Sequence, residues 1–156
     1  MNAKRIVKSY CQKYSVPPSI IFPLLCPIRE YEWLDGWACE MIYSESGFAE
    51  EGCVFKTKLP WEEEETIWVM TKQDPENYIV NFVKVTESKV INMQINLTDN
   101  KLVGGTDAHF IYTYTGLNEK GNIYINQYVE KEFERSMIRI DKSMNYFLEA
   151  GTKLKL

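Results

Sequence analysis

The sequence contains one histidine, His109, and four cysteines among its 156 residues. The cysteines lie 15, 13 and 14 residues apart, form no C-x-x-C pair and have only one histidine to join them as metal ligands. We therefore predict no metal ion and no cofactor, and we expect free, mostly buried thiols. A single histidine in a chain without a G-x-S-x-G turn also disfavours hydrolysis by a serine nucleophile.

An excess of positive charge is lacking as well. Lysine and arginine number 18 against 22 aspartate and glutamate residues, which gives a net charge of −4. No overall positive field therefore attracts phosphates, and we predict that nucleic acid is not a partner.

Long apolar runs are absent too. The longest uncharged stretch, residues 14–28, has only 15 residues and contains four prolines, so it cannot form a membrane-spanning helix. Residues 1–14 contain no uninterrupted apolar segment before a cleavage site, which argues against a signal peptide. We therefore predict a cytoplasmic protein without membrane insertion.

Aromatic residues, in contrast, are abundant. Four tryptophans, ten tyrosines and seven phenylalanines make up 13% of the chain. These side chains bury large areas, and those of Tyr and Trp also need a polar partner. The length fits one domain covering residues 1–156, in which the aromatic residues either line a cavity or fill a core.

Most of the sequence reads as short β-strands. Residues 5–16 predict a first strand that ends at Pro17-Pro18, after which Ser19 is a candidate helix cap and residues 19–34 fit two short helical turns. Six further β-type runs follow at close spacing, joined by turn-forming residues, and predict an antiparallel meander. These runs are residues 37–44, 52–59, 66–72, 78–86, 90–100 and 105–115.

The last part of the sequence has helical periodicity. Apolar residues recur at near 3.6-residue spacing between Asn118, a candidate cap, and Glu149. A helix over residues 118–149 would be roughly 48 Å long at 1.5 Å per residue, long enough to cross the whole sheet. The fold class is therefore α+β, with this helix on the inner face of the sheet.

A curved sheet and a straight helix can leave space between them. The candidates for lining that space are large, and many are methionines or tyrosines, which suit irregular ligands. A filled core without a ligand is the alternative. The candidate lining residues are Met41, Tyr43, Trp68, Met70, Met93, Phe110, Tyr112, Tyr114, Phe133, Met137 and Met144.

Two segments carry a more specific likeness. Residues 26–33 (CPIREYEW) precede Gly36-Trp37, and residues 46–55 run SGFAEEGCVF. With the order of the elements, they resemble an uncharacterised prokaryotic branch of the START-like, helix-grip superfamily called SRPBCC. The resemblance covers nearly the whole chain. It implies a curved antiparallel sheet of about seven strands around the C-terminal helix, with two short helices after the first strand.

The resemblance also implies a function. Members of the superfamily bind lipids, polyketides and similar molecules between sheet and helix, so we expect a small or medium-sized hydrophobic ligand such as a lipid, polyketide or isoprenoid. Phe22, Leu25, Tyr31 and Trp33 would lie where related proteins admit ligands, although Trp33 and Trp37 could instead form a hydrophobic plug. Two alternatives remain: a cyclase or dehydratase acting on such a ligand, and a chaperone-activator-like module that binds a protein partner.

Glu32 is the candidate proton donor for the enzyme alternative. If Trp33 and Tyr31 enclosed it, desolvation would favour its neutral form, which suits a general acid. Arg29 would oppose that shift. An ion pair on the protein surface is the competing interpretation of Glu32.

Two other polar features are expected to face solvent. Alternation along residues 105–115 places His109 on the opposite side from Phe110 and Tyr112, away from the cavity. The four consecutive acids Glu62–Glu65 are predicted to form a solvated loop.

Overall fold

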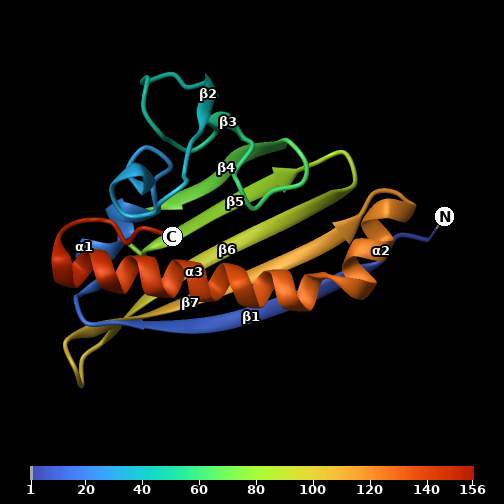
Figure 1. Cartoon of the computed structure of the whole chain (residues 1–156). Coiled ribbons are helices and arrows are strands. Elements are labelled where there is room, and N and C mark those ends of the chain that lie inside the picture. Colours follow the sequence, from blue (N-terminus) through green and yellow to red (C-terminus); the bar gives the residue numbers. More distant parts are fainter. Residues whose placement is uncertain (1) are drawn as a thin grey trace.

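The computed structural model describes residues 2–156, which contain seven strands in one antiparallel sheet (Figure 1). The order across the sheet is β1-β7-β6-β5-β4-β3-β2, so every connection after β2 is a hairpin and the first strand closes against the last. This is the predicted meander. The strands are β1 (Arg5–Tyr14), β2 (Glu40–Tyr43), β3 (Val54–Thr57), β4 (Thr66–Asp74), β5 (Ile79–Val85), β6 (Lys89–Asn100) and β7 (Gly105–Gly116).

Side-chain alternation decides which face of the sheet is buried. Along β6, Ile91, Met93, Ile95 and Leu97 are buried while the residues between them are exposed or partly exposed. Residues two apart in a strand point to the same face, so this row faces the core. The register pairs Met93 with Tyr112 of β7 and thereby carries the apolar face from strand to strand.

The predicted C-terminal helix is interrupted, which corrects the expectation of one helix over residues 118–149. The structure has α2 (Glu119–Gln127) and α3 (Val129–Ala150), separated at Tyr128. The side chain of Asn118 caps α2 by accepting a hydrogen bond from the Gly121 backbone. The two helices point in different directions (Figure 1) because each is fixed by its own contacts. α2 lies against the β5–β6 turn at Ser88, and α3 buries Val129 and other apolar residues over the sheet.

The segment between β1 and β2 forms three short helical turns: α1 (Pro18–Ile21), η1 (Phe22–Leu25) and η2 (Glu30–Glu32). Pro17, not Ser19, occupies the cap position of α1, and no side chain caps this helix, so the predicted role of Ser19 is wrong. Two indole N–H groups stabilise the segment. Trp33 donates to the Leu24 carbonyl at 2.7 Å, and Trp37 donates to the Pro27 carbonyl at 2.8 Å.

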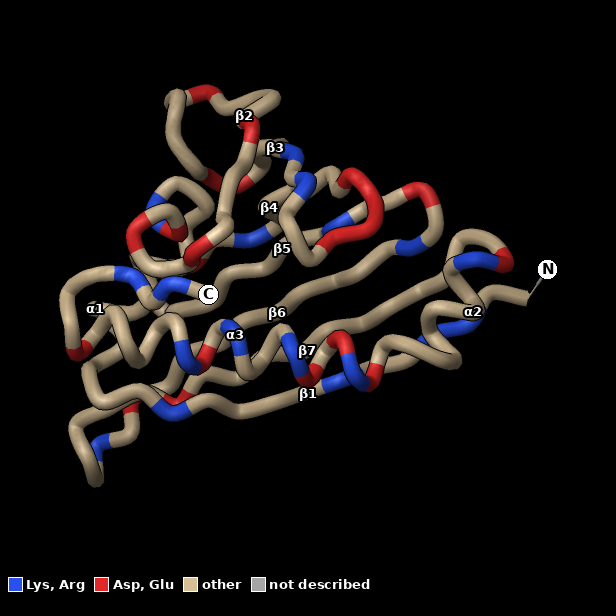
Figure 2. The backbone as a smooth tube through the Cα atoms, in the orientation of Figure 1, with Lys and Arg blue, Asp and Glu red and all other residues tan. Residues whose placement is uncertain are grey.

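The acidic run Glu62–Glu65 lies between β3 and β4 and forms one continuous red segment in Figure 2. It is not simply solvated, which corrects the prediction. Glu62 accepts hydrogen bonds from the Thr57 hydroxyl at 2.8 Å, the Leu59 amide at 2.7 Å and the Thr66 hydroxyl at 2.9 Å. The run therefore fixes the loop that carries Trp61.

Two further expectations are tested by the fold. All four cysteines are free, but only Cys53 is fully buried and Cys11 is exposed, so the thiols are less buried than predicted. Within residues 2–156, no helix is both long and apolar enough to cross a membrane.

Candidate ligand-binding site

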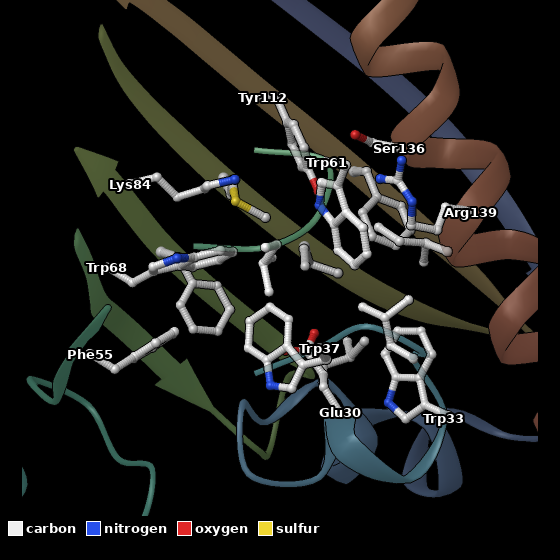
Figure 3. A pocket seen from close by; sticks show the side chains of 18 residues that line it. Glu30, Trp33, Trp37, Phe55, Trp61, Trp68, Lys84, Tyr112, Ser136 and Arg139 are labelled. Atoms are coloured by element: carbon white, nitrogen blue, oxygen red, sulfur yellow. The ribbon is translucent and has the colours of Figure 1, made fainter. Parts of the chain in front are cut away.

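A pocket lies between the concave face of the sheet, the helical turns η1 and η2, and α3 (Figure 3). Its volume is about 80 Å³. All four tryptophans of the chain contribute to its wall. We call this space the inner pocket. It is lined by Leu25, Glu30, Trp33, Leu34, Trp37, Phe55, Leu59, Trp61, Trp68, Phe82, Lys84, Met93, Ile95, Phe110, Tyr112, Ser136, Arg139 and Ile140.

The aromatic wall of the inner pocket is closely packed. The Phe55 and Trp68 rings stack with centroids 5.2 Å apart, and Trp37 meets Trp68 edge-on at 5.8 Å. Phe82 contacts Trp68 in the same edge-on manner at 5.7 Å. Offset and edge-to-face pairs of this kind add stability beyond the area they bury. The wall is therefore a rigid surface suited to apolar or aromatic groups.

Five polar side chains interrupt this wall: Glu30, Lys84, Tyr112, Ser136 and Arg139. Two of them lie over aromatic rings. The Lys84 Nζ is 4.5 Å from the centre of the Trp68 ring, and the Arg139 guanidinium carbon is 4.2 Å from the centre of the Trp61 ring. Such cation–π contacts hold the two cations in place without using their hydrogen-bond donors.

Burial changes the acidity of these groups. It raises the pKa of Glu30 well above its ordinary value, although the charge of Lys84 opposes the shift. Burial likewise lowers the pKa of Lys84 and raises that of the Tyr112 phenol. Each shift disfavours the charged form, as expected for groups removed from water. The pocket thus favours a protonated Glu30 and keeps Tyr112 a hydrogen-bond donor.

A second, larger space adjoins the inner pocket. This outer groove has a volume of about 740 Å³ and lies between β4–β7, the loop carrying Glu62–Glu64, and helices α2 and α3. Both spaces are lined by Trp61, Lys84, Tyr112 and Ser136, so these four residues form the junction between them. The outer groove is also lined by Glu62, Glu63, Glu64, Thr66, Thr86, Ser88, Lys89, Ile91, Tyr114, Glu119, Lys120, Ile123, Tyr124, Tyr128 and Glu132.

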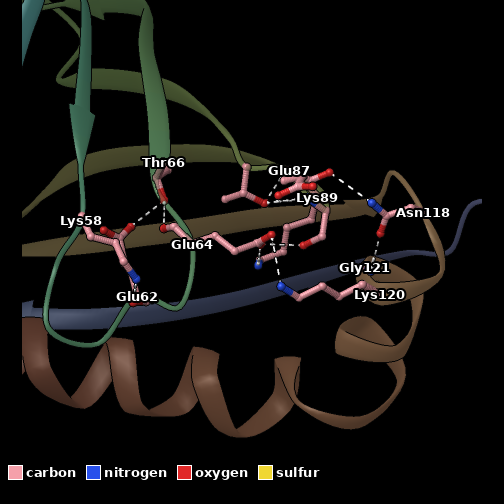
Figure 4. A network of polar contacts seen from close by, with 11 residues as sticks. Lys58, Glu62, Glu64, Thr66, Glu87, Lys89, Asn118, Lys120 and Gly121 are labelled. Carbon is pink, nitrogen blue, oxygen red and sulfur yellow. Dashed lines mark hydrogen bonds and ion pairs between the residues drawn. The ribbon is translucent and has the colours of Figure 1, made fainter.

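Glu64 organises the polar rim of the outer groove (Figure 4). Its carboxylate accepts a hydrogen bond from the Ser88 hydroxyl at 2.6 Å and pairs with the Lys89 Nζ at 3.2 Å and the Lys120 Nζ at 3.5 Å. Burial alone would raise its pKa, but the hydrogen bonds from Ser88, Thr86 and Lys89 outweigh that effect and lower the pKa to about 2. Glu64 therefore joins the β3–β4 loop to the β5–β6 turn and to α2.

The structure places only some of the residues predicted to bind a ligand at the two spaces. Six of them line the inner pocket and one lines only the outer groove. The six are Leu25, Trp33, Trp68, Met93, Phe110 and Tyr112, and the seventh is Tyr114.

The remaining eight candidates line neither space. Four of them, Met70, Phe133, Met137 and Met144, are buried in the core. Phe22 is also buried and packs against Tyr78. Met41 is partly exposed and Tyr43 is exposed, because β2 is a short edge strand with a register shift between them. Tyr31, in η2, is also exposed.

Glu32 does not have the environment that a general acid requires. It is exposed and pairs with Arg29, whose Nε lies 2.6 Å from its carboxylate. This hydrogen bond lowers the pKa of Glu32, whereas a general acid at neutral pH needs a raised one. The buried carboxyl is that of Glu30, two residues earlier. His109 is exposed, on the side of β7 away from the pocket, as predicted.

Several pocket residues were not predicted. Lys84 carried a signal in the sequence, because it continues the inward row of Val80 and Phe82 along β5. Trp61 had no comparable signal, since it lies in a loop. Arg139 lies three residues after Ser136 on α3, at the border of the apolar stripe, where periodicity does not separate core from solvent.

The comparisons with known proteins support the fold. No family model matches the chain, and no curated protein matches it in sequence. Among solved structures, the chain is similar to Ara h 8.0201, with a TM-score of 0.69 at 12% identity over 96% of this chain and 99% of the other. The chain has the helix-grip fold. This finding confirms the predicted likeness in architecture to the START-like superfamily.

Two other similar structures are enzymes by name. The Zhui aromatase/cyclase from Streptomyces sp. R1128 has a TM-score of 0.70 at 8% identity, over 97% of this chain and 100% of the other. Norcoclaurine synthase from Thalictrum flavum, in complex with dopamine and hydroxybenzaldehyde, has a TM-score of 0.67 at 15% identity, over 95% and 89%. At these identities the likeness establishes the fold of the chain alone.

Proposed function

We propose that this protein binds a small or medium-sized, mainly hydrophobic molecule between the sheet and α3. The observation that carries the proposal is an aromatic inner pocket that opens through a four-residue junction into a groove of about 740 Å³. Ligand sites usually have volumes of roughly 300–1,000 Å³ with mostly apolar walls and a few polar groups. The volume of the groove lies in this range, and its wall combines isoleucine and tyrosine side chains with five glutamates and three lysines. A lipid, a polyketide or an isoprenoid-like compound with a polar end suits such a mixed wall.

The volumes indicate how such a ligand would lie. The inner pocket, at about 80 Å³, is smaller than the roughly 150 Å³ cavity that holds a benzene ring in an engineered protein. The body of the ligand would therefore occupy the outer groove, with only one end at the junction. Ile91, Tyr114, Ile123 and Tyr124 provide apolar surface for that body.

The test is to block the junction. In a Ser136→Trp variant the new indole would fill the passage between the two spaces, whereas Ile138→Trp places the same group on the exposed side of α3. The probe is 1-decanol, which is uncharged, and its binding is measured by titration calorimetry. We expect it to bind the wild-type protein and Ile138→Trp equally. Ser136→Trp should bind at least about tenfold more weakly, a loss of about 1.4 kcal/mol.

Native mass spectrometry of freshly purified protein supplies a second measurement, because a resident ligand would appear as an added mass that Ser136→Trp lacks. Absence of any bound species, together with no heat of binding for 1-decanol, would overturn the proposal. Equal binding by the two tryptophan variants would place the site elsewhere.

A cyclase or dehydratase activity is the second candidate function, and the raised pKa of Glu30 favours it. A protonated carboxyl that faces an aromatic pocket can act as a general acid. Glu32 is unsuited to this role because its pKa is lowered. A Glu30→Gln variant separates the two functions, since it should keep binding 1-decanol but lose turnover of a reactive poly-β-ketone thioester. Unchanged turnover in that variant would exclude the assignment of Glu30.

A further inference from the structure

The junction between the inner pocket and the outer groove gathers hydrogen-bond donors. Lys84, Tyr112 and Ser136 line both spaces, and Arg139 lines the inner pocket beside them. They come from three elements: Lys84 from β5, Tyr112 from β7, and Ser136 and Arg139 from α3. Figure 3 shows the Lys84 amine above the Trp68 ring, the Tyr112 hydroxyl near Trp61, and Ser136 and Arg139 on the other side of Trp61. Four donors from different parts of the chain therefore face one space.

None of these four side chains has a hydrogen-bond or ion-pair partner within residues 2–156; the Lys84 amine lies over the Trp68 ring and the Arg139 guanidinium over the Trp61 ring. Two buried donors elsewhere in the core are paired, whereas the buried Ser143 hydroxyl has no partner in the described part of the chain. The Trp68 indole N–H donates to the Thr57 hydroxyl at 2.9 Å, and the Gln12 amide donates to the Met137 carbonyl at 2.9 Å. Lys84, Ser136 and Arg139 are half-buried and line a cavity, so an acceptor placed there would meet their donors without displacing an existing partner.

Two carboxylates near the junction have other partners. Glu62 accepts hydrogen bonds from Thr57, Leu59 and Thr66, in its own loop and the strands beside it, and Glu132 pairs with Arg135 at 2.8 Å. Glu30 lines the inner pocket, where burial favours its neutral form, and Glu63, Glu64 and Glu119 line the outer groove. In the described part of the chain, Lys84 and Arg139 therefore form no close ion pair, and the charges of Glu62 and Glu132 reach them only at longer range.

We propose that the junction binds the carboxylate of an amphipathic organic acid whose hydrocarbon body lies in the outer groove. The inference rests on the function proposed above and specifies its ligand class. An ionised carboxylate is an acceptor-only group that takes several donors at once. Arg139 stacks its face on Trp61, which leaves the N–H groups at the edge of the guanidinium for a planar carboxylate.

The experiment compares three probes that share one hydrocarbon chain: decanoate, 1-decanol and decylamine. Titration calorimetry at pH 7, below the concentrations at which the probes aggregate, should give decanoate at least about tenfold tighter binding than 1-decanol. Decylamine should bind most weakly, because its ammonium group would face Lys84 and Arg139. The carboxyl resonance of ¹³C-labelled decanoate should also shift on binding.

Variants test the assigned donors. Lys84→Met and Arg139→Met should each weaken decanoate binding about tenfold more than they weaken 1-decanol binding. Lys72→Met and Lys142→Met, which remove exposed lysines from β4 and α3, are the matched controls and should alter neither affinity. Ser136→Ala removes one neutral donor at little risk to folding and should weaken decanoate binding by a smaller factor.

The possible results separate this inference from the proposed function. Equal affinities for decanoate and 1-decanol would overturn the carboxylate site and leave the hydrophobic site standing. The same conclusion follows if Lys84→Met weakens both probes alike. Failure of all three probes to bind would overturn both proposals.

Discussion

Replacing Gly121 by alanine is expected to destabilise the protein by about 3 kcal/mol, although alanine is the better helix former by about 1 kcal/mol. A Cβ atom at Gly121 would overlap the carbonyl oxygen of Ser88 and would lie 3.1 Å from the Cα of Gly116. Both obstacles are backbone atoms, and the Ser88 carbonyl also accepts a hydrogen bond from the Leu117 amide at 2.8 Å. The steric overlap of the new Cβ atom can therefore be removed only if α2 moves away from the sheet.

Urea denaturation at pH 7 measures this effect. The control is Asn126→Ala, which introduces the same residue at an exposed position of the same helix and should change the free energy of unfolding by less than about 0.5 kcal/mol. A Gly121→Ala variant as stable as the wild-type protein would show that α2 does not dock closely on the β5–β6 turn.

Glu64→Gln is expected to cost about 3 kcal/mol at pH 7, and the cost should depend on pH. The side chains of Glu64 and Lys89 are only 10% and 12% exposed, so solvent screens their interaction weakly. The folded protein lowers the pKa of Glu64 from 4.5 to about 2. Since the folded state then binds protons less readily than the unfolded state, the stabilisation is complete above about pH 5 and disappears as the pH falls toward 2.

Denaturation series at pH 7, 5 and 3 check this prediction. The difference in unfolding free energy between the wild-type protein and Glu64→Gln should shrink as the pH falls. Glu65→Gln is the matched control, because Glu65 is exposed and belongs to the same loop. A difference that stays constant across this range would mean that packing of the side chain, and not its charge, accounts for the loss.

The strands could be predicted from the sequence because the periodicity and turn signals agree. β6 alternates cleanly between buried and exposed side chains, and turn-forming residues separate most of the strands. The break at Tyr128 could not be predicted in the same way. The apolar stripe passes through it without interruption, and the contact between Gly121 and Ser88 that directs α2 joins residues far apart in the sequence.

The candidate site was predictable only in part. Trp68, Met93, Phe110 and Tyr112 follow from alternation once the inner face of the sheet is known. Tyr43 was misplaced because the shifted register of β2 exposes a residue that strict alternation would bury. The positions of the polar groups in the site depend on how the loops pack against α3. Local patterns in the sequence do not encode that packing.

The location of every tryptophan around one cavity has a spectroscopic consequence. Indole emission will originate from the wall of the inner pocket, as will the tryptophan bands of the near-ultraviolet circular dichroism. Trp37 and Trp68, 5.8 Å apart and inclined at 83°, are close enough for their excited states to couple. The protein thus carries a built-in optical reporter of occupancy, and its spectra describe the state of this cavity more than that of the fold as a whole.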